Sequence, residues 1–190
     1  MTRYIAFLRA INVGGHVVKM NPLRGLFNEL PGVSDARTYI ASGNVIFESA
    51  ARNTQSLEKK IADQLHQSLG YEVATFLRTA AELSEIAAYR PFPESQMKNA
   101  GLYIGFLAES LTRNAQQEVM SFATAVDDFH VHRREIYWLC RVRSSDSEFS
   151  LARLEKALGT RATFRNSTTI RKMAAIYSTL RHRTRHTRST

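Results

Sequence analysis

The sequence predicts an α+β fold of two ferredoxin-like units, each with the strand and helix order βαββαβ of a split βαβ motif, and a C-terminal helix. Three observations carry this prediction. The order of apolar runs and helical patterns in residues 1–90 recurs in residues 91–180, although the residues themselves do not. Two prolines within residues 90–95 separate the halves. The length of 190 residues accommodates two units of about 80 residues with a linker.

The first half, residues 1–90, is predicted to hold one unit and a connecting helix. Its elements are a strand over residues 4–11, a helix from Asn21 to residue 30, strands over 33–41 and 44–47, a helix over 54–69, a strand over 71–77 and a helix over 79–88. Asn21 before Pro22 is typical of an N-cap followed by proline in the first turn. Ser42 and Gly43 favour a tight hairpin turn. Apolar residues at every fourth position mark the long helix, and Gly70 ends it.

The second half, residues 91–180, repeats this order. Its elements are a strand over residues 102–107, a helix after Thr112, strands over 129–132 and 136–142, a helix over 151–158 and a strand over 162–164. Arg133 and Arg134 are expected at the hairpin turn, and Gly159 is expected to end the second helix. Thr168 or Thr169 is expected to cap a terminal helix with apolar residues on one face.

The chain is basic, with 26 Lys and Arg against 17 Asp and Glu and a formal net charge of +9. Four of these arginines and no acid lie in residues 181–190, a polar tail that we expect to be disordered. The first 180 residues therefore carry 22 basic and 17 acidic side chains, a net charge of +5. This charge is compatible with a small anionic ligand and with nucleic acid as a partner.

The sequence predicts a cytoplasmic protein. The apolar run near the N-terminus is too short for a signal peptide and is interrupted by Arg9. No stretch approaches the about 18 apolar residues of a membrane span, so no membrane partner is expected. Cys140 is the single cysteine, which excludes an intrachain disulfide and fits a reducing compartment. The sequence does not indicate an oligomeric state.

Polar and glycine-containing segments follow strands that the predicted topology brings to one edge. The first two strands run parallel with the third antiparallel between them, so the segments Asn12–Gly15 and Ser42–Asn44 meet there. Exposed backbone N–H groups and a helix N-terminus favour anions. We therefore predict a small anionic or polar ligand bound by Arg9, Asn12, Gly14, Gly15, Lys19, Ser42, Gly43 and Asn44. The spaced lysine of a P-loop and the third glycine of a dinucleotide-binding turn are absent, so ordinary turns are the alternative interpretation.

Two groups of motifs resemble a bacterial family known as domain of unknown function 1697. The first comprises residues 8–15, 19–20, 23–24 and 37–47, and the second comprises Arg165, Asn166 and residues 168–172. The sequence departs from the family pattern at Ala10 and Ser167, and the loop after Gly15 is short. The resemblance implies a cytosolic protein of ferredoxin-like halves and brings no established activity. Arg165, Asn166 and Thr168 would join the ligand site if the C-terminal helix returns to the first half.

Other kinds of site have weaker support in the sequence. His130 and His132 alternate within a predicted strand near Asp127 and Asp128, but no third metal ligand is defined, and no cofactor is identified. No Ser-His-Asp or Cys-His arrangement can be assigned, so catalytic residues and enzymatic activity stay open. RNA or single-stranded DNA binding through the basic surface and tail is the alternative function. Tyr39 and Phe47 are candidates for base stacking, although core packing is favoured and the RRM signature is absent.

Overall fold

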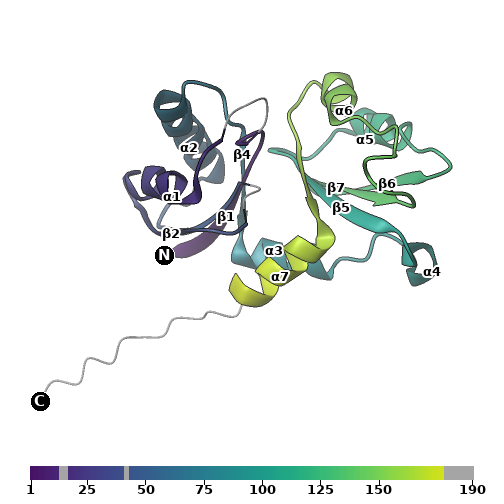
Figure 1. Ribbon diagram of the computed structural model, residues 1–190, viewed down its shortest axis with the longest axis horizontal. Coiled ribbons are helices and arrows are strands. Elements are labelled where there is room, and N and C mark those ends of the chain that lie inside the picture. The colour runs from purple at the N-terminus through teal and green to yellow at the C-terminus, as the bar shows by residue number, and fades with distance from the viewer. Residues whose placement is uncertain (13–16, 41–42, 178–190) are drawn as a thin grey trace, which may run out of the picture.

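The computed structural model describes residues 1–12, 17–40 and 43–177, which form two four-stranded antiparallel sheets (Figure 1). The first sheet has the strand order β2-β3-β1-β4, and the second has the order β6-β7-β5-β8. Both orders are those of a split βαβ unit, because the third strand of each unit lies between the first two and antiparallel to both. The predicted α+β fold of duplicated ferredoxin-like units is therefore confirmed.

The elements follow one another as the sequence predicts. The first group comprises β1 (Thr2–Leu8), α1 (Met20–Asn28), β2 (Val33–Thr38), β3 (Asn44–Ser49), α2 (Thr54–Leu69), β4 (Thr75–Thr79) and α3 (Ala80–Ala88). The second comprises α4 (Glu94–Met97), β5 (Gly101–Phe106), α5 (Arg113–Met120), β6 (Asp127–His132), β7 (Glu135–Cys140), α6 (Leu151–Leu158), β8 (Thr163–Asn166) and α7 (Ser167–Tyr177). The short helix α4, after two prolines, was not predicted.

Two predicted helix caps are wrong. The helix α1 begins at Met20 with Lys19 at the N-cap position, so Asn21 lies inside the first turn. Pro22 fits there because the first N–H groups of a helix have no intrahelical partner. At the start of α7, Asn166 Oδ1 accepts a hydrogen bond from the Thr168 amide at 2.8 Å, so Asn166 provides the cap in place of Thr168 or Thr169.

Two predicted strands end early for a common reason. β1 stops at Leu8 and β2 stops at Thr38, and the backbone turns into the left-handed region two residues later. Ala10 has φ 60° and Ile40 has φ 50°. This conformation is costly for a residue with a Cβ atom and cannot continue an extended strand. Both bends occur at the edge where the ligand site is predicted.

Three apolar cores hold the molecule together. One lies between the first sheet and α1 and α2, and another between the second sheet and α5 and α6. The central core joins the opposite faces of the two sheets and includes side chains of α3 and α7, which pack side by side (Figure 1). Phe7 of β1 and Phe106 of β5 stack at its centre, with ring centroids 3.8 Å apart and planes at 8°. The two units thus bury their sheet faces against each other.

Candidate functional site

Arg165 of β8 reaches out of its own unit to the predicted edge of the first sheet. Its Nε donates to Asn44 Oδ1 at 2.7 Å, and its Nη2 donates to the Leu8 carbonyl at 2.8 Å and the Gly43 carbonyl at 3.4 Å. The side chain also donates to Thr163 Oγ1 and the carbonyl of Phe164, and the residue is only 8% exposed. The structure therefore brings Gly43, Asn44 and Arg165 together at this edge.

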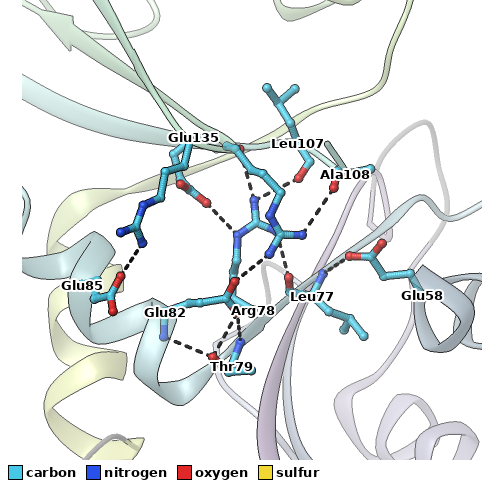
Figure 2. A network of polar contacts seen from close by, with 11 residues as sticks. Glu58, Leu77, Arg78, Thr79, Glu82, Glu85, Leu107, Ala108 and Glu135 are labelled. Carbon is cyan, nitrogen blue, oxygen red and sulfur yellow. Dashed lines mark hydrogen bonds and ion pairs between the residues drawn. The ribbon is translucent and has the colours of Figure 1, made fainter. Parts of the chain in front are cut away.

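Arg78 of β4 makes the equivalent contacts in the opposite direction (Figure 2). Its Nε donates to Glu135 Oε1 at 2.7 Å and its Nη2 donates to the Leu107 carbonyl at 2.9 Å. The strand registers explain the correspondence, because Asn44 lies opposite Phe7 just as Glu135 lies opposite Phe106. Each arginine also lies over a phenylalanine of the other unit, Arg78 over Phe106 and Arg165 over Phe7. Each unit therefore contributes one buried arginine whose guanidinium donates hydrogen bonds to the other unit.

The two arginine sites differ in one group, which is a carboxylate in one and an amide in the other. Glu135 neutralises Arg78, whereas no carboxylate in the described part of the chain forms an ion pair with Arg165. Burial lowers the pKa of Arg165 to about 10. Because that pKa lies far above neutral pH, the guanidinium keeps its charge there. The first sheet's edge therefore contains a buried positive charge whose hydrogen-bond acceptors are all neutral.

Arg9 lies at the same edge and is paired with Glu155 of α6. Its Nε and Nη2 donate to the two carboxylate oxygens, both at 2.6 Å, in a bidentate arrangement. Glu155 is nearly buried and also accepts a hydrogen bond from the Ala162 amide at 2.8 Å. Arg161 approaches the same carboxylate at 3.7 Å. This carboxylate, which the sequence did not indicate, therefore holds α6 against the end of β1.

Two cavities open beside this ion pair. The larger has a volume of about 560 Å³ and is lined by Arg9, Ala152, Glu155, Lys156, Gly159, Thr160 and Arg161. The smaller, of about 270 Å³, shares Arg9 and Arg161 and is otherwise lined by residues of α2 and of the segment before β4. The larger cavity has three cationic side chains and one carboxylate, a net charge of +2 on its walls. It is a cationic cleft between the two units.

The other predicted site residues lie apart from this cleft or outside the described residues. Asn12 is exposed, and its Oδ1 accepts a hydrogen bond from the Val18 amide at 2.7 Å. Lys19 is exposed at the start of α1, and Asn166 and Thr168 are exposed at the start of α7. Asn166 does not join Arg165 because successive strand side chains point to opposite faces. Gly14, Gly15 and Ser42 lie outside the described residues.

Gly43 is required by the geometry of this edge. It has φ +74°, and a Cβ atom would lie 2.5 Å from Ile11 Cγ2. Gly43→Ala is therefore expected to lower the free energy of unfolding by about 1–3 kcal/mol in urea titrations. Gly25, inside α1, has nothing within 4 Å of its Cβ position, so Gly25→Ala should raise it by about 0.5–1 kcal/mol. Equal unfolding midpoints for Gly43→Ala and the native chain would contradict this account.

The aromatic and histidine candidates are engaged in packing. Phe47 is fully buried in the first core, and Tyr39 meets Tyr177 edge to face at 6.2 Å. The sheet face that an RRM domain uses for base stacking is covered here by the second unit. His130 Nε2 lies 2.8 Å from the Tyr89 hydroxyl, and burial, helped by the nearby His132, lowers the pKa of His130.

Within the described ranges, no three His, Cys, Asp or Glu side chains are grouped to hold a metal ion. The helices described here are also too short or too polar to cross a membrane. The cleft at Arg9 has an excess of positive charge and lies at the same sheet edge as the buried Arg165.

The fold and the cleft define a two-unit α+β protein with a cationic inter-unit site. The chain belongs to the family described as protein of unknown function DUF1697, whose family model matches residues 1–137. This finding confirms the resemblance in the sequence motifs. The structure is similar to that of the conserved bacterial protein SP0830 from Streptococcus pneumoniae, with a TM-score of 0.75 and 22% identity over 93% of this chain and 98% of that chain. No curated protein matches the chain.

Proposed function

We propose that this protein binds a small anionic ligand in the cationic cleft between α6 and the end of β1. The observation that carries the proposal is the excess of positive charge there. Arg9, Lys156 and Arg161 face one carboxylate, and Arg165 lies buried behind the same edge with neutral partners. The volume of about 560 Å³ falls in the range of small-molecule sites. A phosphate or carboxylate group would balance this charge.

The C-terminal end of α6 carries a partial negative charge that opposes anion binding. This effect is weaker than the attraction of the cleft side chains. The helix ends at Leu158 with Gly159 in the left-handed region, and Gly159 and Thr160 line the cleft, so the C-terminal end of the helix borders it. A helix C-terminus acts as roughly half a negative charge. The side chains of the cleft contribute a net charge of +2, which is larger than this partial charge of the helix end. The balance therefore favours an anion.

The proposal is tested by ligand-induced thermal stabilisation of the full chain. Inorganic phosphate, citrate and adenosine monophosphate serve as anionic probes, with adenosine as the neutral counterpart. An anion at about 100 times its Kd should stabilise the protein by about 2.7 kcal/mol, which raises the melting temperature. We expect at least one of the anions to raise the melting temperature. Adenosine should not compete with that anion for the cleft.

Two variants test the source of the charge. Arg161→Ala removes a cation of the cleft, and Asn44→Asp places a carboxylate beside Arg165 as Glu135 stands beside Arg78. A unit charge acting across about 10 Å at an effective dielectric constant of about 20 contributes about 1.7 kcal/mol. Each variant should therefore weaken anion binding more than about tenfold. Lys98→Ala, which removes an exposed lysine at the end of α4, should leave binding unchanged.

The same titrations separate this function from nucleic-acid binding. If no anion stabilises the native chain, or if Arg161→Ala binds as tightly as the native chain, the cleft is not the site. Single-stranded RNA that binds with a steep salt dependence, and loses affinity when residues 181–190 are deleted, would favour the alternative. In that case small anions would compete only weakly with the RNA.

A further inference from the structure

A separate cavity lies between α3 and the β6–β7 hairpin. Its volume is about 400 Å³, and none of its lining residues belongs to the cationic cleft. The acidic side chains of α3 and β7 on its wall are seen in Figure 2. A volume of this size accommodates a small molecule. The side chains on its wall decide which kind of molecule it could bind.

Tyr137 of β7 supplies a polar group without a partner. The residue is fully buried and lines the cavity, and its hydroxyl has no hydrogen-bond partner among the described residues. A buried hydroxyl without a partner is destabilising, and few remain in folded proteins. Burial raises the pKa of Tyr137, so the phenol keeps its proton and can donate it in a hydrogen bond. The hydroxyl therefore calls for an acceptor atom.

Two further rings, those of Tyr89 and His132, line the cavity beside Tyr137. Tyr89 stacks on His132 with ring centroids 4.1 Å apart, and it lies 5.2 Å from the ring of Tyr137 at an angle of 45°. Ile86 of α3 adds an apolar side chain. Rings in these arrangements favour a flat aromatic guest, because offset and tilted ring pairs are the preferred geometries of π-systems.

The charges around this cavity are balanced. Glu82 pairs with Arg134 at 2.8 Å, Glu85 pairs with Arg133, and Glu135 pairs with Arg78 at 2.7 Å. Each carboxylate on the wall thus has an arginine beside it. A charged ligand would lose its hydration without gaining an opposite charge, so a neutral ligand fits this wall best.

We infer that this cavity binds a neutral, planar heteroaromatic molecule whose acceptor atom receives a hydrogen bond from the Tyr137 hydroxyl. The ring of the ligand packs against Tyr89 and Tyr137, and its polar edge faces the hydroxyl. This site differs from the cationic cleft in position, charge and ligand, so it stands independently of the proposed function.

Benzimidazole and indole test the inference as a matched pair. They have the same bicyclic shape and one N–H each, but only benzimidazole has a ring nitrogen that accepts a hydrogen bond. We expect benzimidazole to bind the full chain at least about tenfold more tightly than indole, as measured by ligand-observed NMR at neutral pH. Tyr137→Phe should abolish this difference without lowering the melting temperature, because the hydroxyl has no partner to lose.

A second variant locates the binding. Ala88→Trp places a large ring at an exposed position on the cavity rim and should weaken both probes while leaving the melting temperature unchanged. Equal affinities of benzimidazole and indole, or no binding of either at about 1 mM, would overturn the inference. So would a Tyr137→Phe variant that melts several degrees lower, because its hydroxyl would then already be satisfied in the free protein.

Discussion

Glu135→Ala is expected to lower the free energy of unfolding by about 3–5 kcal/mol, because it leaves the Arg78 guanidinium buried without its counter-ion. Arg78 is fully buried and Glu135 is 3% exposed. The guanidinium would retain its carbonyl acceptors at Leu77 and Leu107, but burial without Glu135 would lower the pKa of Arg78 further. The loss is measured as a shift of the urea midpoint at neutral pH.

Glu135→Gln separates the charge from the hydrogen bond. The amide oxygen of glutamine can accept from Arg78 Nε, as the amide oxygen of Asn44 accepts from Arg165 Nε at 2.7 Å. This variant should therefore lose less stability than Glu135→Ala. Glu118→Ala, at an exposed position of α5, should change the stability by no more than about 0.5 kcal/mol. If Glu135→Ala has the same urea midpoint as the native chain, the stability of the buried Arg78 does not depend on its counter-ion.

Phe7→Ala is expected to cost about 3–5 kcal/mol, because it opens a cavity at the centre of the contact between the two sheets. The ring is fully buried and stacks on Phe106 at 3.8 Å, which adds about 0.5–1.5 kcal/mol to the burial. Since the stack joins the two units, Phe106→Ala should cost a similar amount. Urea unfolding followed by fluorescence and by circular dichroism measures both.

The double variant tests whether Phe7 and Phe106 act as a pair. Two residues in direct contact are not additive, so Phe7→Ala with Phe106→Ala should cost less than the sum of the single losses. Phe92→Ala, a half-buried ring near His130, should cost less than either. If the single losses add fully, the two rings do not stabilise each other and the contact between the units rests on other side chains.

The local elements were predictable because the signals for them are local. The helix α2 shows this best, since its four-residue spacing, its start at Thr54 and its end at Gly70 all agree with the structure. Gly70 has φ 80°, a conformation that glycine adopts without a steric penalty. The caps of α1 and α7 were predicted wrongly because several neighbouring polar residues can serve as caps, and tertiary packing chooses among them.

The candidate site was predictable only in part. The topology correctly placed the segment after β1 beside the segment before β3, and the Leu8 amide donates to the Gly43 carbonyl at 2.8 Å. Arg9 was placed at this edge, but its partner Glu155 lies 146 positions away, and the cations Lys156 and Arg161 belong to the other unit. No local pattern marks such partners, because they are selected by the packing of the two units.

The order of the elements, their approximate ends, the duplicated α+β fold and the family could be inferred from the amino-acid sequence alone. These follow from periodicity, turn residues and motifs, which act over a few neighbouring positions. Other contacts became visible in the folded chain: Arg165 reaches Asn44 across 121 positions and Leu8 across 157, and Asn44 lies where the other unit has Glu135. No local pattern indicates these contacts, because a buried charge depends on every group packed around it, and those groups are brought together by the contact between the sheets.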